Sequence, residues 1–581
     1  MHVVAVGLQA AQARAPAADG AGARVLRSHR LLARGAAEVF FPRSVGRSGL
    51  HAAKFARPAG PSSPRTEGGP APPGDPHRRA PEPLVLPCAP ISNRHRRPIV
   101  SDLLNDLEPR LLWRYFLELS RIPRGSKREA EAARWVADQG RALGCEVLTD
   151  ALGNVLIRKP GTKGREDRPG VCLQGHVDMV CEKNEGTAHD FARDPIAVHR
   201  EGDVVRARGT TLGADNGIGV AAGLAVLASQ DVRHGPVEVL VTIDEETGLT
   251  GAKGLAPGWF RSPFLLNLDS EEEGELTIGC AGGVDTVATR RVSFAAPAPG
   301  TVALRLKVSG LKGGHSGIDI SAGRGNSLRI LAQVLDALVA RHGVAIAAVN
   351  GGNKRNAIPR EASAMLRVEA GREGALREDV ARLAREWRAA LGAFDPNLAI
   401  DVEPGAADRV LAPADAQAVV GLLLAGPHGV EAMSPDIAGL VQTSTNLGLA
   451  QTQDDAVLVT FLTRSAIDAS RQALAARIAA TCALAGFDAR QEGGYPGWKP
   501  EPGSSLVRLV DRVHAEVFGK PMVVKAIHAG LECGLIGEKY PGVEMASIGP
   551  DIKDAHTPDE HASISSVAAF WRLLVAVLER V

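Results

Sequence analysis

The sequence lacks a long hydrophobic run, a paired-cysteine motif and an excess of charge, and each absence excludes a class of protein. No apolar stretch of the 581 residues approaches the roughly 20 that a membrane-spanning helix needs. The seven cysteines are widely scattered without a CxxC pair, which predicts neither a disulfide framework nor a thiolate zinc site. Reduced cysteines in a cytoplasmic protein explain this pattern. Net charge is only +1, so we expect no nucleic-acid binding.

The first hundred residues differ in composition from the rest of the chain. They carry 15 Lys and Arg residues against five acids, a net charge of about +10 that leaves about −9 for the remainder. They are rich in Pro, Gly and Ala with almost no apolar periodicity, which predicts disorder. Three interpretations stay open: a spurious or functionless extension ahead of a start near Val100, a basic arm that binds polyanions, or a targeting segment.

Four apolar segments each lead into acidic or histidine residues. The segments are Val171–Leu173 before His176 and Asp178, Val237–Ile243 before Asp244–Glu246, Phe264–Leu268 before Asp269, and Val543–Ile548 before a loop with His556. Helical patterns such as Ile218–Leu227 intervene, which predicts parallel strands in an α/β sheet. Because ligand sites in such sheets lie at the carboxyl ends of the strands, we expect the four loops to meet.

The residue types in these loops suit a metal site, although each also has a simpler explanation. His176 and Asp178 share one face of an extended chain, as in a metal-bound imidazole oriented by a carboxylate or in a plain hydrogen bond. Asp215 precedes an apolar helix, where it is either an N-cap or a carboxylate that bridges two cations. The run Asp244–Glu246 is either a solvated turn or a set of carboxylates that cations compensate. We expect Glu271–Glu273 to form an exposed acidic turn.

Two histidines and at least three carboxylates favour a divalent cation, with zinc usual and cobalt or manganese as substitutes. Two such ions about 3.5–4 Å apart would polarise a carbonyl and lower the pKa of a water between them. Peptide hydrolysis also needs a base that takes the proton of the water and returns it to the leaving amine. Glu245, if it binds no metal, fits this role.

Longer motifs around these residues resemble the aminoacyl-histidine dipeptidases. These are bacterial relatives of the carnosinases within the di-zinc aminopeptidase and carboxypeptidase superfamily. The resemblance runs from about Ser101 to the C-terminus, and the first hundred residues have no counterpart. The motifs that carry it are Gly175–Val180, Thr211–Gly217, Asp244–Gly248, Asn267–Asp269, Asn356–Glu361, Thr443–Gly448 and His556–Glu560.

The resemblance implies a complete two-metal site. His176 and Asp269 would hold one zinc ion, Glu246 and His556 the other, with Asp215 between them, Glu245 as the general base and Asp178 supporting His176. It also implies a cytoplasmic homodimer that is joined through a lid domain.

The implied fold is an α/β catalytic domain with a mixed, mainly parallel sheet, helices on both faces and an inserted α+β lid. We expect the catalytic domain at residues 101–296 and 493–581 and the lid at 297–492. In the lid, Thr301–Ser309 alternates apolar and polar residues as a strand does, and Asn326–Arg341 has the apolar stripe of a helix.

Several lid residues are candidates for substrate binding. His315 lies in a glycine-rich loop, as a free loop histidine or, by the resemblance, as a substrate or oxyanion contact that crosses a dimer. Asn356 and Arg360 are further candidates, since a guanidinium group can hold the C-terminal carboxylate of a dipeptide with two hydrogen bonds. The remaining candidates could contact the same peptide or form an ordinary polar turn; they are Ser444, Thr445 and Asn446.

The function that the sequence predicts is hydrolysis of dipeptides, Xaa-His dipeptides such as carnosine included. Alternatives on the same metal chemistry are a tripeptide aminopeptidase, a carboxypeptidase or an N-acyl amino-acid deacylase. An alternative of another class is a non-catalytic binding protein, which the intact Glu245 and the complete ligand set disfavour.

Overall fold

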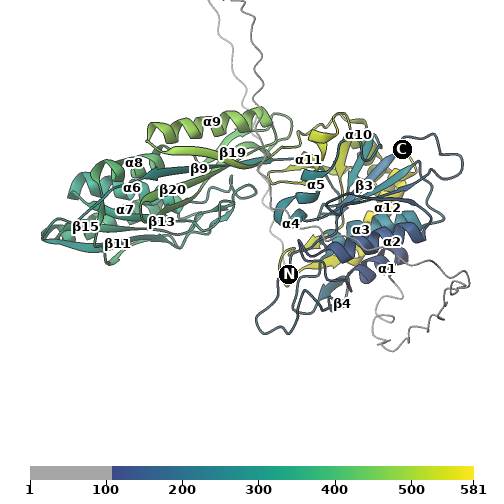
Figure 1. Ribbon diagram of the computed structural model, residues 1–581, viewed down its shortest axis with the longest axis horizontal. Coiled ribbons are helices and arrows are strands. Elements are labelled where there is room, and N and C mark those ends of the chain that lie inside the picture. Colours follow the sequence, from purple (N-terminus) through teal and green to yellow (C-terminus); the bar gives the residue numbers. More distant parts are fainter. Residues whose placement is uncertain (1–106) are drawn as a thin grey trace, which may run out of the picture. The chain divides into compact units, whose positions relative to one another are not determined.

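The computed structural model describes residues 107–581 (Figure 1). Contacts divide the chain into residues 1–92 and 93–581, and everything below concerns the second unit. The three interpretations of the first hundred residues lie outside the described part. Within residues 107–581, no helix combines the length and the apolar character that crossing a bilayer requires.

The first sheet has eight strands in the order β1-β2-β6-β3-β7-β23-β8-β22. Strands β3, β6, β7 and β23 are parallel neighbours, which confirms the prediction from the four apolar segments. Their shared carboxyl edge carries the loops with the candidate ligands. The strands are β1 (Glu146–Thr149), β2 (Val155–Lys159), β3 (Val171–His176), β6 (Val237–Thr242), β7 (Phe264–Asn267), β8 (Glu275–Cys280), β22 (Val523–Ile527) and β23 (Glu544–Ser547).

Both faces of this sheet are buried, because successive side chains of a strand point to opposite faces. In β2, Ile157 packs in one core and Leu156 in another. The first core takes in α1 (Arg110–Leu119), α2 (Ala130–Ala142), α3 (Ala214–Ala228), α10 (Ser505–Phe518) and α12 (Ile564–Leu578). The second takes in α5 (Thr250–Gly254) and α11 (Glu532–Lys539). The sheet is therefore the centre of a three-layer α/β domain.

The second sheet has nine strands, and all of its pairings are antiparallel. A separate core joins it to four helices, α6 (Ser327–His342), α7 (Glu373–Leu391), α8 (Pro413–Ala425) and α9 (Asp468–Leu484). Its strands are β9 (Gly282–Arg291), β11 (Thr301–Ser309), β13 (Ala345–Gly351), β15 (Ala362–Glu369), β16 (Ala399–Pro404), β18 (Gly429–Met433), β19 (Val441–Thr452), β20 (Ala456–Ser465) and β21 (Asp488–Tyr495). We call the segment from Gly282 to Tyr495 the lid.

Short strands complete the two domains. A four-stranded sheet contains β4 (Val198–Glu201), β5 (Val204–Ala207), β24 (Ile552–Lys553) and β25 (His561–Ser563). Two-stranded sheets pair β10 (Phe294–Ala295) with β17 (Val410–Leu411) and β12 (Gly314–His315) with β14 (Ala357–Ile358). The four-stranded sheet supports the loop of His556, and β12 places His315.

The chain passes from the first sheet to the second over a single residue. Ala281 lies between the end of β8 and the start of β9, and its N–H lies within hydrogen-bond distance of two carbonyls, those of Ile527 (3.1 Å) and Ala529 (2.9 Å). Cys280 and Trp498 exchange two backbone hydrogen bonds of 2.9 Å at the same junction. Both crossings of the chain between the sheets are thus held by backbone contacts.

Candidate metal centre

Asp215 lies between two histidines from distant parts of the sequence. Its Oδ1 is 3.1 Å from Nε2 of His176, and its Oδ2 is 3.1 Å from Nε2 of His556. On the first side, Asp269 Oδ1 lies 3.3 Å from the same His176 nitrogen. On the second, Glu246 Oε2 lies 3.0 Å from Nε2 of His556. Two groups of potential ligand atoms therefore share one carboxylate, each group compact enough to hold a cation.

His176 is the last residue of β3, and Asp178 fixes its surroundings. Oδ1 of Asp178 lies 3.4 Å from Nδ1 of His176, the ring nitrogen that faces away from Asp215. The Asp178 carboxylate also accepts hydrogen bonds from Ser126 Oγ (2.7 Å) and from the N–H groups of Glu245 (3.0 Å) and Glu246 (3.3 Å). One buried carboxylate thus ties the histidine to the loop that carries the two glutamates.

A second buried carboxylate, that of Glu560, holds the loop of Asp215. Oε2 accepts hydrogen bonds from the N–H groups of Leu212 (2.7 Å) and Gly213 (2.9 Å), and Oε1 accepts those of Ala214 (2.7 Å) and Asp215 (3.3 Å). The backbone of Asp215 is extended rather than helical (φ −76°, ψ 115°), and its two carboxylate oxygens face His176 and His556 instead of capping helix α3. The Asp215 side chain is left free to face the histidines.

The guanidinium of Arg124 fastens this loop to the loop after β3. It donates to the carbonyls of Val177 (2.9 Å), Asp178 (3.2 Å) and Gly213 (2.5 Å), and it is fully buried. Its position requires glycine next to it, since a Cβ at Gly213 would lie 2.5 Å from Nη2.

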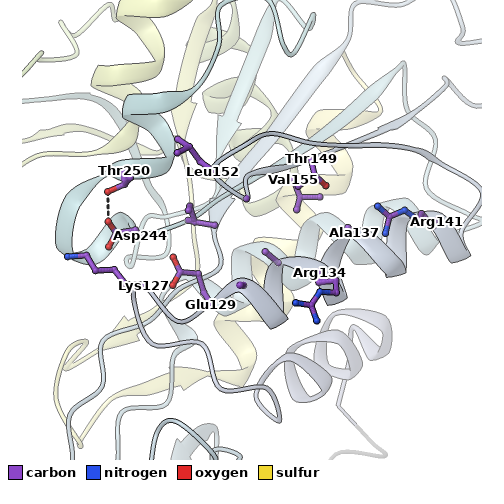
Figure 2. A pocket seen from close by; sticks show the side chains of 14 residues that line it. Lys127, Glu129, Arg134, Ala137, Arg141, Thr149, Leu152, Val155, Asp244 and Thr250 are labelled. Carbon is purple, nitrogen blue, oxygen red and sulfur yellow. Dashed lines mark hydrogen bonds between the residues drawn. The ribbon is translucent and has the colours of Figure 1, made fainter. Parts of the chain in front are cut away.

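The three acids of the run Asp244–Glu246 have three different environments. Asp244 is buried, and Figure 2 shows its carboxylate accepting a hydrogen bond from the hydroxyl of Thr250. It lines a cavity of about 530 Å³ together with residues along helix α2, and this cavity includes none of the ligand candidates. Glu245 and Glu246 instead line a cavity of about 560 Å³ with the two histidines. Asp244 therefore holds the turn, and its two neighbours face the site.

Several carboxylates lie close together in the site, and this negative charge shifts the pKa values of its ionisable groups. Burial, with nearby carboxylates, raises the pKa of Asp269 to about 6 and that of Glu245 well above its usual value. Hydrogen bonds to Asp215 and Glu246 raise the pKa of His556 to about 11. Burial would lower the pKa of His176, but the charge of Asp269 and hydrogen bonds to three carboxylates raise it well above its usual value. Two divalent cations would compensate this charge, so the donor set fits metal ions.

The cavity of about 560 Å³ is lined by the candidate ligands and also by the turn that follows Asp269 and by residues between Lys525 and Leu531. Glu271 and Glu272 line it, so the expected exposed acidic turn is wrong in part: Glu271 is half-buried, and burial raises its pKa to about 8. The turn follows Asp269 directly, so its first side chain is carried back toward the site. Among the described lid residues, Ile318 alone contributes to the lining.

The structure brings the metal-site candidates together and places the lid candidates elsewhere. Asn356 and Arg360 are exposed, and Arg360 lines a separate cavity of about 310 Å³. The three candidates in the Thr443–Gly448 motif are buried in strand β19 rather than in a turn. Ser444 Oγ lies 2.7 Å from Nε2 of His528, Thr445 Oγ1 donates to Leu462 O, and Asn446 Nδ2 donates to the carbonyls of Arg355 and Ala357.

His315 belongs to a buried polar network that the sequence did not reveal. Its Nε2 lies 3.3 Å from Nη2 of Arg464, and the same guanidinium donates to the hydroxyl of Tyr495 (3.0 Å). Burial and the charge of Arg464 lower the pKa of His315 to about 4 and that of His528 to about 3. Both rings are therefore neutral near pH 7, and the network carries the single charge of Arg464.

Sequence reasoning missed three supporting residues of the site, Arg124, Glu532 and Glu560, and also Arg464 of the lid network. Glu560 lies in a recognised motif, and this position was the signal that could have found it. Glu532 is fully buried and accepts hydrogen bonds of 2.6 Å from Gln174 and Thr242 in the strands that carry the site. Arg124, Glu532 and Arg464 lie in segments without a distinctive pattern, so only the folded chain shows their contacts.

A three-layer α/β domain with an inserted lid and clustered His, Asp and Glu residues defines a class of hydrolase. The model of peptidase family M20/M25/M40 matches residues 172–580, and the chain belongs to this family. It is therefore a peptidase.

Two relatives match almost over their whole length. The chain is 41% identical to the cytosol non-specific dipeptidase of Escherichia coli (strain K12) over 479 residues, which cover 82% of this chain and 99% of the relative. It is 42% identical to the aminoacylhistidine dipeptidase of Vibrio alginolyticus, whose crystal structure superimposes with a TM-score of 0.76 over 82% of this chain and 98% of the other.

Proposed function

We propose that this chain is a dipeptidase that uses two zinc ions. The observation that carries the proposal is the position of Asp215, each of whose carboxylate oxygens lies 3.1 Å from a different histidine. His176 and Asp269 would hold one ion, Glu246 and His556 the other, and Asp215 both. Imidazole with carboxylate is a donor set that zinc favours, and cobalt or manganese can replace it.

When bound, the ions would polarise the scissile carbonyl and make the attacking water more acidic. Glu245 lines the same cavity, and no hydrogen bond or ion pair of its carboxylate is found within residues 107–581. This carboxylate takes the proton of the attacking water and delivers it to the nitrogen of the leaving amine. Asp178 orients His176 and, through the N–H of Glu245, holds the base in place.

We propose free dipeptides as substrates, Xaa-His dipeptides such as carnosine among them. The support comes from the two relatives, one named a non-specific dipeptidase and the other an aminoacylhistidine dipeptidase. Because the first relative is a cytosol dipeptidase, it also supports a cytoplasmic location. His315 is the lid candidate with the best support as a substrate contact, because Ile318 of the same loop lines the cavity. The roles of Asn356 and Arg360, those of the β19 residues and the homodimer stay predictions.

A substrate panel on metal-stripped protein tests the proposal. The protein is stripped with a chelator, restored with zinc, cobalt or manganese, and assayed on carnosine, Ala-Ala, a tripeptide and an N-acetyl amino acid. We expect the stripped protein to be inactive and the restored protein to cleave the dipeptides. Activity confined to the N-acetyl amino acid would contradict the dipeptidase assignment, and activity without metal would contradict the site.

A further inference from the structure

Glu271 is a carboxylate in the reaction cavity whose side chain has no partner among residues 107–581. The cavity contains seven acidic residues, of which four, Asp215, Glu245, Glu246 and Asp269, have roles in the proposed reaction. Two more are neutralised within the chain: Glu272 lies 2.6 Å from Lys553 Nζ, and Glu275 pairs with Lys525. The side chain of Glu271 has neither a hydrogen bond nor an ion pair in the part of the chain that the structure describes.

The backbone around Glu271 is fixed at both ends of the turn. Asp269, two residues earlier, lies near the start of the loop after β7 and beside His176. The carbonyl of Glu271 itself accepts a hydrogen bond of 3.1 Å from the N–H of Ile552, in the segment that leads to His556. The backbone of Glu271 therefore lies between Asp269 and the segment that leads to His556, and its side chain lines the cavity with the ligand candidates of both halves.

A free dipeptide brings one positive charge to this cavity, on its α-ammonium group. This group is attached to the carbon next to the scissile carbonyl, so it must lie close to the metal centre whenever that carbonyl does. An ammonium group that leaves water needs an opposite charge and hydrogen-bond acceptors, or its binding is strongly unfavourable. Glu271 is the cavity carboxyl group that remains available for it, and an ammonium group placed beside it favours its ionised form.

We propose that Glu271 binds the free α-ammonium group of the dipeptide and thereby selects substrates with an unblocked N-terminus. This inference rests on the proposed function. It also separates that function from N-acyl amino-acid deacylation, whose substrates carry no charge at this position and gain nothing from an unpaired carboxylate. The β-ammonium group of carnosine lies one bond further from the carbonyl and carries the same charge, so we expect the same carboxylate to bind it.

Two substrates that differ in a single group test the inference. Ala-Ala carries the ammonium group, and N-propanoyl-alanine is the same molecule without it. We expect the unaltered enzyme to prefer Ala-Ala in kcat/KM. Glu271→Gln keeps the shape and removes the charge, and it should lower kcat/KM for Ala-Ala on the order of 10- to 100-fold, as for a lost charged hydrogen bond, without lowering that for N-propanoyl-alanine. Glu271→Asp should keep the preference for Ala-Ala.

The matched control is Glu273→Gln, an exposed glutamate of the same turn that does not line the cavity. It should leave both substrates unchanged. Metal content and Tm of every variant show whether the site is intact. Equal losses on both substrates in Glu271→Gln, or a retained preference for Ala-Ala, would overturn the inference while leaving the dipeptidase function standing. If the unaltered enzyme cleaves only N-propanoyl-alanine, both the inference and the proposed function fail.

Discussion

The backbone N–H of Asp215 donates a hydrogen bond of 3.3 Å to Oε1 of Glu560, the last of four N–H groups that this buried carboxylate accepts. The loop of the central ligand is thus shaped by a residue far along the chain. We predict that Glu560→Gln lowers metal affinity about 10- to 100-fold, the usual effect of changing a group that orients a ligand. An amide nitrogen cannot accept the N–H groups that one carboxylate oxygen accepts now. Titration of the stripped protein with zinc measures the effect.

The neighbouring Asp559 provides the control for this prediction. Its side chain is exposed, and we expect Asp559→Asn to bind zinc as the unaltered protein does. Equal zinc affinity in Glu560→Gln and Asp559→Asn would show that the Asp215 loop keeps its shape without Glu560.

Substitutions of Glu245 and Glu246 should affect catalysis and metal binding separately. Glu245→Gln removes the base, and we expect kcat to fall about 10²- to 10⁴-fold while both ions stay bound. Glu246→Gln removes a ligand atom beside His556 and should lower the metal content of the protein. The measurements are kcat on Ala-Ala and the zinc content of each purified variant. Near-normal turnover in Glu245→Gln would refute the assignment of the base.

Removing the metal should destabilise the fold. The site gathers buried carboxylates, and a cation that binds only the folded chain stabilises it by about 2.7 kcal/mol when present at 100 times its Kd. We expect a chelator to lower Tm and added zinc to restore it. Asp269→Asn should show a smaller Tm difference between the stripped and restored forms, because it lacks one ligand. An equal Tm difference in this variant would argue against Asp269 as a ligand.

The histidines around Arg464 should make the fold sensitive to acid. The pKa of His528 is lowered to about 3 by burial and by the charge of Arg464, so the folded protein keeps this ring neutral. The unfolded chain binds a proton near its ordinary pKa of 6.5. Above pH 6.5 the ring is neutral in both states and costs the fold no stability. As the pH falls from 6.5 toward 3, protonation of the unfolded chain lowers the free energy of unfolding. Between pH 7.5 and 5 this loss is up to about 2 kcal/mol for one ring.

Denaturant unfolding of the unaltered protein and of His528→Gln at the two pH values tests this expectation. Because other groups titrate in the same range, the informative quantity is the difference between the two proteins. His528→Gln should lose less free energy of unfolding on acidification. An identical loss would show that His528 is protonated in the folded state. Leu484→Gln, at a residue with 92% exposure, is a suitable control.

The first sheet could be predicted because each of its four central strands has a recognisable local sequence pattern. Each of the four is a short apolar run that stops at a polar residue. Such a run is expected of a strand that is buried on both faces. The strands of the lid were visible as alternating patterns, as in Thr301–Ser309. Their partners were not, because pairing depends on contacts between distant segments. The sequence therefore did not show that β9 and β21 pair with each other.

The candidate metal site was predictable to the extent that its candidate ligands lie at or after the ends of strands. His176 and Glu246 depend on local geometry, and the fold brings them to one edge. Glu271 was misjudged, since three successive glutamates look the same in a sequence although a turn aims each in a different direction. Arg464 was missed because a buried arginine depends on partners in other segments, here Tyr495 and His315.

The order of strands in the first sheet has a consequence for how the protein is made. Strand β23, near the C-terminus, inserts between β7 and β8, and His556 follows it. A ribosome must therefore release the chain as far as His556 before the sheet can close and this proposed ligand can arrive. With the proposed ligand set, a growing chain has no complete catalytic centre at any earlier stage, so we expect it not to attack peptides until this segment has emerged.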